Sequence, residues 1–269
     1  MKTAMTISPP SGKLKFVSAM SSLDETIAYV AKNGFDAAEL AIRDPKELDP
    51  AAIKKTLDEN KIDLCVVGTG QSYAVDRLSL TSPDPENQKN AVERYKSQIR
   101  FAAYFGANIV IASSLGVVEE GVERAQAEEW AVKNLLELSA VAGDEGITIL
   151  LEPINRYETN FINTIDQALA FNEKVENRLR ILFDTFHMNI EAKSFTGELL
   201  KVKEKLGHVH IADSNRWAPG CGHINFQDIV HFLDEIGYDK YISAEVLPSP
   251  TVEKAIEITA GTFKAVLKK

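Results

Sequence analysis

The chain has 269 residues, 45% of them hydrophobic and 26% charged, a composition typical of soluble globular proteins rather than of disordered, fibrous or membrane-spanning ones. Thirty Lys and Arg residues against 39 Asp and Glu residues give a formal net charge of −9. Because nucleic-acid-binding proteins usually present a basic face, we expect no nucleic-acid partner.

The N-terminal stretch MKTAMTISPPSGK lacks an apolar core of about 7–15 residues, so we expect neither a signal peptide nor a membrane anchor. The sequence therefore favours a cytoplasmic protein. Cys65 and Cys221 lie far apart and form no CxxC pair. Since a cytosolic chain of this size needs no disulfide, we interpret both as reduced thiols.

Short β-branched or aliphatic runs recur along the chain and predict eight strands. In chain order they are 13–18, 37–42, 63–68, 108–113, 148–153, 180–185, 208–213 and 241–247. Their nearly continuous apolar character is typical of parallel strands that are covered on both faces. Residues 1–12, before the first run, are expected to form a flexible N-terminal segment.

Segments with helical periodicity lie between these runs. Asp49 and Pro50 predict the start of one helix, and Asn163 or Thr164 caps another. The segment 115–146 is longer than one crossover needs and predicts an extended helix or an extra helical turn. Glycines stand where helices should end before the next strand: Gly34, Gly106, Gly146 and Gly237.

The alternation of strand and helix continues to the C-terminus without a linker or a shift in composition. It predicts one α/β domain over residues 1–269, a single (β/α)8 TIM barrel, rather than an open doubly wound sheet. The active site of such a barrel lies at the C-terminal ends of its strands, so the polar residues that end the apolar runs are the informative ones.

Each of the last four predicted strands ends in a residue able to bind a metal, namely Glu152, Asp184, His210 and Glu245. Taken singly, such a carboxylate is usually a helix cap or an ion-pair partner, and such a histidine a core residue. Together they would place three carboxylates around one point, where a divalent cation offsets their repulsion. Three oxygen ligands and one imidazole favour Mn²⁺, with Mg²⁺ or Co²⁺ as alternatives.

Further candidates lie on the loops that follow these strands. Glu158, His187 and Arg216 can overhang the mouth of the site, with surface ion pairing as the alternative for each. His208 lies deeper in its strand, where a structural role is expected. His223, in the loop APGCGHINF, either contacts substrate or closes the loop.

Four stretches resemble the ketose 3-epimerases, the D-tagatose and D-psicose 3-epimerase family of the xylose-isomerase-like barrel superfamily. They are LEPINRYE (151–158), DTFHMNIE (184–191), HVHIADSNRWAPGCGH (208–223) and SAEVLP (243–248), and the resemblance runs from about residue 14 to the C-terminus. With ELAIRDP (39–45) and GTGQSY (68–73), the chain is most similar to the 5-keto-L-gluconate epimerases of inositol breakdown, which form D-tagaturonate.

This resemblance implies a divalent-metal-dependent carbohydrate epimerase that binds its metal through the four strand-end residues. It also implies that Glu152 and Glu245 are the catalytic acid/base pair, and that Glu158, His187 and Arg216 hold the carbonyl end of the substrate. A homodimer or homotetramer is implied as well. The match departs from the neutral-sugar epimerases at strand 1 and just after strand 2, so the substrate is less well defined than the reaction.

Inversion of a carbon next to a ketone requires removal of a C–H proton and return of a proton from the opposite face. Glu152 and Glu245, at either end of the predicted ligand arc, can flank the substrate for this purpose. A metal ion that polarises the ketone lowers the barrier to a cis-enediolate. The expected partner is therefore a small keto-sugar or keto-sugar acid.

A sugar acid needs local positive charge, and arginine is the residue that binds carboxylates best. Arg43 and Arg77 follow the second and third predicted strands and are the candidates. Each has an acidic neighbour, Asp44 or Asp76, so surface pairing is the alternative.

Other activities fit parts of the sequence. A ketose 3-epimerase acting on D-tagatose, D-psicose or D-fructose, or an aldose–ketose isomerase such as a hydroxypyruvate isomerase, would use a similar site. A DNA-repair endonuclease would need several metals and a basic groove, which five histidines and a net charge of −9 disfavour. A non-catalytic sugar-binding protein would not need the glutamate pair.

Overall fold

Eight parallel strands close into a barrel in a computed structural model that describes residues 1–11, 19–111 and 115–267. The strands are β1 (Lys2–Ile7), β2 (Ala37–Ala41), β3 (Asp63–Gly68), β4 (Asn108–Ile111), β5 (Ile149–Leu151), β6 (Arg180–Asp184), β7 (Leu206–Ile211) and β8 (Tyr241–Ala244). Each pairs with its neighbours in sequence, and β8 pairs with β1. The predicted barrel is thereby confirmed.

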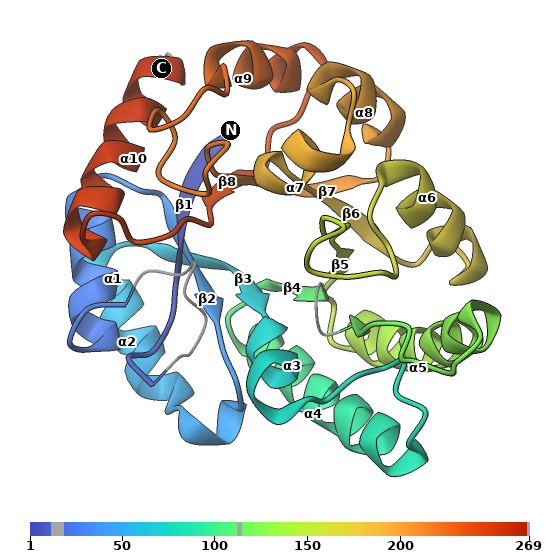
Figure 1. Cartoon of the computed structure of the whole chain (residues 1–269). Coiled ribbons are helices and arrows are strands. Elements are labelled where there is room, and N and C mark those ends of the chain that lie inside the picture. Colours follow the sequence, from blue (N-terminus) through green and yellow to red (C-terminus); the bar gives the residue numbers. More distant parts are fainter. Residues whose placement is uncertain (12–18, 112–114, 268–269) are drawn as a thin grey trace.

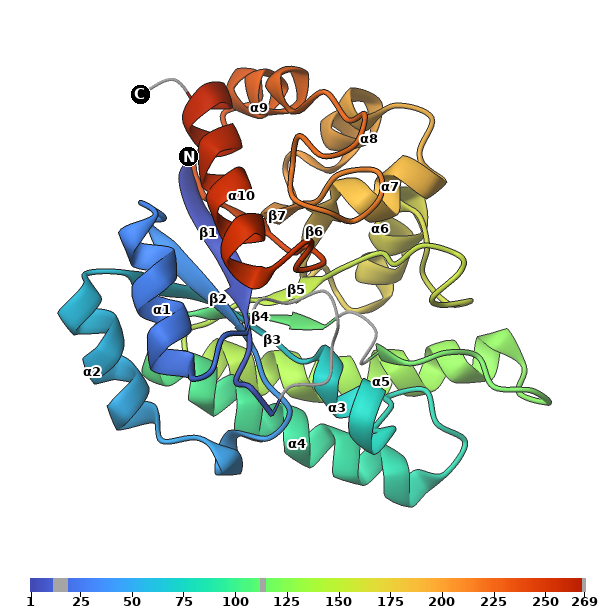
Figure 2. The ribbon, with the colours of Figure 1, turned by 60° about the vertical axis from the view of Figure 1, so that its left-hand side comes forward.

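Helices form a ring around the strands (Figure 1). They are α1 (Leu23–Lys32), the 3₁₀ turn η1 (Pro45–Glu47), α2 (Pro50–Asn60), α3 (Gly70–Asp76), α4 (Pro85–Tyr104), α5 (Arg124–Asp144), α6 (Ile165–Lys174), α7 (Thr185–Glu191), α8 (Phe195–Val202), α9 (Phe226–Glu235) and α10 (Val252–Val266). Figure 2 shows α4 and α5 packed side by side. No helix in the described ranges combines the length and apolarity needed to cross a bilayer.

The first strand differs from the prediction. The strand expected at 13–18 lies outside the described residues, and Lys2–Ile7, expected to be part of a flexible segment, is β1. Five of its six residues are buried because β1 is hydrogen-bonded between β2 and β8. The run KTAMTI has two large apolar side chains against three in KLKFVS, so it gives the weaker strand signal, and its burial comes from the two strands beside it.

Helix boundaries follow the sequence signals. Asp49 Oδ1 accepts hydrogen bonds from two backbone N–H groups at the start of α2, and Thr164 forms a reciprocal capping box with Gln167 at the start of α6. Gly106, with φ of 68°, follows α4 and leads into β4. The long helix predicted within 115–146 is the 21-residue α5.

Gly207 in β7 lies where two other strands leave no room for a side chain. A Cβ atom there would lie 2.5 Å from both Arg180 Cβ and Leu150 Cδ2. We expect Gly207→Ala to lower the free energy of unfolding by about 1–3 kcal/mol, because neighbouring atoms must shift. Urea denaturation measures this, with Gly261→Ala in α10 as the matched control, because a Cβ there would meet no atom within 4 Å beyond its chain neighbours and its own helix backbone. A loss of equal size in the control would contradict the steric explanation.

Candidate active site

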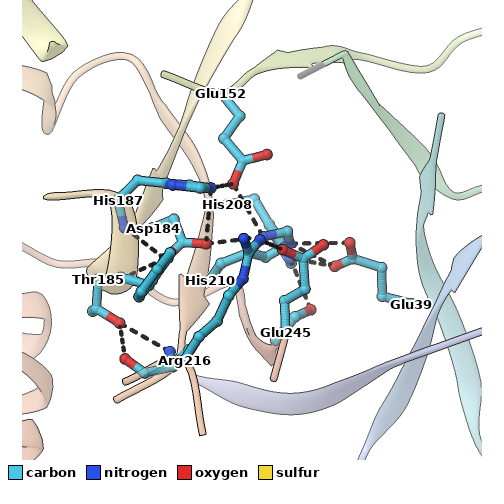
Figure 3. Close-up of polar contacts among 12 residues, drawn as sticks. Glu39, Glu152, Asp184, Thr185, His187, His208, His210, Arg216 and Glu245 are labelled. Carbon is cyan, nitrogen blue, oxygen red and sulfur yellow. Dashed lines mark hydrogen bonds and ion pairs between the residues drawn. The ribbon is translucent and has the colours of Figure 1, made fainter. Parts of the chain in front are cut away.

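The four predicted ligands converge at the C-terminal end of the barrel (Figure 3). Glu152 follows β5, Asp184 ends β6, His210 lies next to last in β7, and Glu245 follows β8. Because the four strands are neighbours, one ligand atom of each residue lies within 4.8 Å of those of the others. The side chains of Glu152, Asp184 and His210 are buried, and that of Glu245 is 12% exposed.

The atoms that face one another in this cluster lack hydrogen-bond partners. His210 Nδ1 lies 3.4 Å from Glu152 Oε1 and 3.8 Å from Asp184 Oδ2, and none of the three atoms has a hydrogen bond within the described part of the chain. Unpaired carboxylate oxygens are costly to bury. Three carboxylates and one imidazole that converge in this way fit a divalent cation.

The pKa values of the two glutamates also reflect the cost of placing several carboxylates together in this buried cluster. Burial raises the pKa of Glu152 to about 8, and the negative charges of Glu245 and Asp184 add to the effect. Burial also raises the pKa of Glu245, with Asp184 adding to the shift. Both carboxyls therefore hold protons more strongly than usual, until a cation compensates for their charge.

Asp184 divides its two oxygens between the helix and the cluster. Its Oδ1 accepts hydrogen bonds from the backbone N–H groups of Phe186 (2.6 Å) and His187 (3.4 Å) at the start of α7. Its Oδ2 is left for the cluster. From the sequence alone, helix capping and metal binding are alternative roles for such a carboxylate. The structure shows that Asp184 can fill both.

Glu39 in β2 is a site residue that the sequence analysis did not single out. It is 1% exposed, and both of its oxygens lie 3.0 Å from His210 Nε2 (Figure 3). Burial alone would raise the pKa of Glu39, but His210 and His208 hold it well below its usual range. An ionised Glu39 accepts the Nε2–H of His210, which turns Nδ1 toward Glu152 and Asp184.

His208 lies behind His210, as expected for a structural residue. Its Nε2 is 3.0 Å from Glu39 Oε2 and 2.8 Å from Ser243 Oγ. Glu39, His208 and His210 have the spacing of a second metal group, but their facing atoms are hydrogen-bonded to one another. This trio therefore supports a ligand of the first group instead of forming a centre of its own.

Arg216 brings positive charge to the cavity above the cluster. Its Nη1 lies 2.9 Å from Glu158 Oε1 and its Nη2 lies 2.9 Å from Glu245 Oε2. The guanidinium stacks over the ring of Phe186, 4.9 Å from its centroid. One cavity is lined by Arg216, Glu158, His187 and the candidate ligands Glu152, His210 and Glu245.

His187 in α7 approaches the same cluster. Its Nε2 lies 3.9 Å from both Glu152 Oε1 and Asp184 Oδ2, too far for a hydrogen bond. Burial lowers the pKa of His187 to about 4, and Arg216 contributes in the same direction. The imidazole is therefore neutral near pH 7.

A family model described as the xylose isomerase-like TIM barrel matches residues 27–262. The chain belongs to this family. It is 29% identical over 229 residues to D-psicose 3-epimerase of Ruminiclostridium cellulolyticum (81% of this chain, 76% of the relative) and 32% identical over 244 residues to L-ribulose 3-epimerase of Methylomonas sp. (89% and 84%). A solved structure of D-psicose 3-epimerase with D-tagatose from Clostridium cellulolyticum H10 covers 99% of this chain and 97% of its own, with 27% identity and a TM-score of 0.81.

This xylose isomerase-like barrel is an enzyme of the isomerase class, since its curated relatives are sugar epimerases. The predicted resemblance to the ketose 3-epimerases is confirmed, because relatives named D-psicose, L-ribulose and ketose 3-epimerase match over most of the chain.

The structure does not bring Arg43 or Arg77 to the cavity of this family member. Arg43 Nη2 lies 2.7 Å from Asp76 Oδ1, and its Nη1 lies 3.2 Å from Glu47 Oε1. The guanidinium of Arg77 lies over the ring of Tyr73. Neither is among the described residues that line the cavity.

His223 also lies away from the cavity, in an exposed loop. Its Nδ1 is 2.9 Å from Ser214 Oγ, within the same loop. Asp213 fixes that loop by accepting hydrogen bonds from the backbone N–H groups of Ser214, Gly220 and Ile224. Of the two roles considered for His223, these contacts fit loop closure.

The cluster predicts a specific response to metal. Adding Mn²⁺ to chelator-treated protein should raise the melting temperature by roughly 5–10 °C at a hundredfold excess over Kd, the equivalent of about 2.7 kcal/mol. Asp184→Asn should abolish the shift, because the ligand charge is lost. The amide oxygen can still cap α7. Asp166→Asn, an exposed residue of α6, is the control. The shifts are measured by differential scanning fluorimetry. Equal shifts in Asp184→Asn and Asp166→Asn would exclude this cluster as the binding site.

Proposed function

We propose that the protein is a metal-dependent sugar epimerase that inverts the carbon adjacent to the ketone of a keto-sugar. The observation that carries the proposal is the pair of carboxyls at either end of the arc of four ligand atoms, Glu152, which is buried, and Glu245, which is 12% exposed. A site with two such groups supplies a base on each side of a bound carbon. The relatives named above are epimerases of keto-sugars, which supports the same reaction.

Glu152, Asp184, His210 and Glu245 would hold a divalent cation, Mn²⁺ by preference, which supplies Lewis-acid polarisation of the ketone when bound. One glutamate removes the proton from the carbon next to the ketone. The C–H electron pair becomes the new C=C bond, and the C=O pair moves to oxygen, giving a cis-enediolate. The other glutamate, which starts in its protonated form, donates its proton to the opposite face of the same carbon as the C=O bond re-forms, so the configuration inverts.

Two cavity residues can stabilise the developing oxyanion. The unpaired Nε2 of His187 and the guanidinium of Arg216 both reach the space above the cluster. Hydrogen bonds directed at developing charge contribute more than those made to the ground state. Glu158, paired with Arg216 at 2.9 Å, holds the guanidinium in place.

For the substrate, we propose a keto-sugar acid of the 5-keto-L-gluconate type, converted to D-tagaturonate in inositol catabolism. The resemblance carried by the stretches ELAIRDP and GTGQSY, which span the ends of β2 and β3 and the residues after them, supports this choice. Neutral keto-hexoses are the second candidate. They are favoured by Arg216, which is the only Lys or Arg among the described cavity residues and already contacts two glutamates.

A product screen tests this proposal. Protein with added Mn²⁺ is incubated separately with 5-keto-L-gluconate, D-tagatose, D-psicose, D-fructose and hydroxypyruvate, and the products are resolved by chromatography. We expect epimerised product and incorporation of solvent deuterium at the inverted carbon. A preference for neutral ketoses would contradict the sugar-acid substrate. Formation of an aldose would show that the reaction is isomerisation and not epimerisation.

We further propose that the protein assembles as a homodimer or homotetramer, as the family resemblance implies. Sedimentation equilibrium measures this directly. A monomer at micromolar concentration would contradict it.

A further inference from the structure

Asn155, in the loop between β5 and α6, takes part in no role described so far. We propose that Asn155 is a positioning residue that holds His187 in the Nε2–H tautomer, so that His187 serves as a fixed hydrogen-bond donor to the substrate. The role of His187 toward the substrate rests on the proposed epimerase function. Its tautomer is inferred separately, from two hydrogen bonds to one ring nitrogen. Asn155 is 1% exposed, so its contacts are not shared with bulk solvent.

Both groups that Asn155 directs at His187 are N–H groups. The backbone N of Asn155 lies 3.3 Å from His187 Nδ1, and the side-chain Nδ2 lies 2.8 Å from the same atom. A backbone N–H can only donate, so Nδ1 must be the acceptor. An imidazole with an acceptor at Nδ1 carries its ring hydrogen on Nε2.

The orientation of the Asn155 amide is set by two other contacts. The backbone N–H of Tyr157 donates to Asn155 Oδ1 at 3.0 Å, which identifies that atom as the oxygen. Asn155 Nδ2 also lies 2.9 Å from Glu158 Oε1, an acceptor. A flipped amide would place two acceptors together at Glu158 and two donors together at Tyr157, so the assigned orientation satisfies every partner.

The loop and the helix that carry these residues are tied together. Arg156 makes a two-pronged ion pair with Glu191 at the end of α7, with Nε–Oε1 of 2.9 Å and Nη2–Oε2 of 2.7 Å. The Arg156 backbone N–H also donates to Glu191 Oε1 at 2.7 Å. This clamp lies one residue from Asn155 and on the same helix as His187, so it fixes the distance between them.

The tautomer determines what His187 can do. Its Nε2–H faces the cluster, buried and without a hydrogen bond in the described part of the chain. A nitrogen that already carries its hydrogen cannot accept the substrate proton. His187 therefore donates to a substrate oxygen, while proton transfer is left to the glutamates. Because Asn155 also contacts Glu158, one amide aligns two of the residues proposed to hold the substrate.

Nitrogen NMR of histidine-labelled protein tests the tautomer directly. Long-range ¹⁵N–¹H spectra of the full chain near pH 7.5, metal-free and with Mg²⁺, should show His187 with a protonated Nε2 and an unprotonated Nδ1. The His187 signals are assigned by their loss in His187→Gln. In Asn155→Asp a carboxylate oxygen replaces the closer donor, at 2.8 Å, and should outweigh the backbone N–H at 3.3 Å, so Nδ1 should gain a hydrogen. Asn90→Asp, the same change at an exposed position of α4, should leave the spectrum unchanged.

Kinetics provide the second measurement. Asn155→Asp should lower kcat by roughly 10²-fold, the loss expected for one misdirected oxyanion donor, whereas Asn90→Asp should not. If Asn155→Asp does not fold, Asn155→Ala removes only the side-chain donor and should give a mixture of tautomers with a smaller loss.

The two levels of the proposal fail separately. An Nδ1–H or doubly protonated His187 in the wild type, or an unchanged tautomer in both Asn155 variants, would overturn the role of Asn155 while epimerisation stands. The expected tautomer in a protein without epimerase activity would instead overturn the proposed function.

Discussion

Glu152→Gln and Glu245→Gln are each expected to fold normally and to lose epimerisation, with kcat lower by about 10²–10⁴-fold. An amide keeps the size of the carboxyl and one oxygen for the metal, but it cannot accept or return the substrate proton. Folding should survive because burial already raises the pKa of both carboxyls, so a neutral side chain at either position removes a charge that the metal-free protein tolerates poorly.

The decisive measurement is exchange of the substrate hydrogen with deuterated solvent, followed by proton NMR at saturating Mn²⁺. Saturation separates the loss of a base from a weaker metal site. Glu47→Gln, on the surface beside Arg43, is the matched control and should exchange at the wild-type rate. Normal exchange in both active-site variants would show that these glutamates are not the bases, whatever their role toward the metal.

Seven of the eight strands and all four candidate ligands could be predicted because both depend on local pattern. A strand buried on two faces reads as an apolar run, and a ligand such as Asp184 comes at the end of the run. The strand at Lys2–Ile7 could not be read in this way, because its burial comes from pairing with strands that begin 35 and 239 residues away along the chain.

The residues that the sequence did not reveal act through partners distant in the chain. Glu39 contacts His210 across a separation of 171 residues, and Asn155 contacts His187 across 32. Arg43 illustrates the opposite error, since its main partner Asp76 lies 33 residues away and holds it at the surface. The one available signal for Glu39 was an acidic residue inside the apolar run AAELAI, which is costly unless it is paired.

Glu39→Gln is expected to weaken Mn²⁺ binding by about 10–100-fold, the usual effect of losing a carboxylate that orients a metal-bound histidine. Glu39 accepts hydrogen bonds from both His208 and His210. Glutamine offers one oxygen and presents N–H donors where the second oxygen stood, so one histidine loses its acceptor. If His210 turns its lone pair toward the new amide, its hydrogen moves to Nδ1, and that nitrogen no longer faces Glu152 and Asp184 as a ligand.

Calorimetric titration with Mn²⁺ measures this effect without substrate. Ser243→Ala is the informative comparison, because it removes the other partner of His208 while the contact between Glu39 and His210 remains. That variant should bind Mn²⁺ nearly as tightly as the wild type, and Glu39→Asp should fall between the two. Equal losses in Glu39→Gln and Ser243→Ala would mean that general packing behind β7 sets the affinity; a loss confined to Glu39 means that the orientation of a single imidazole does.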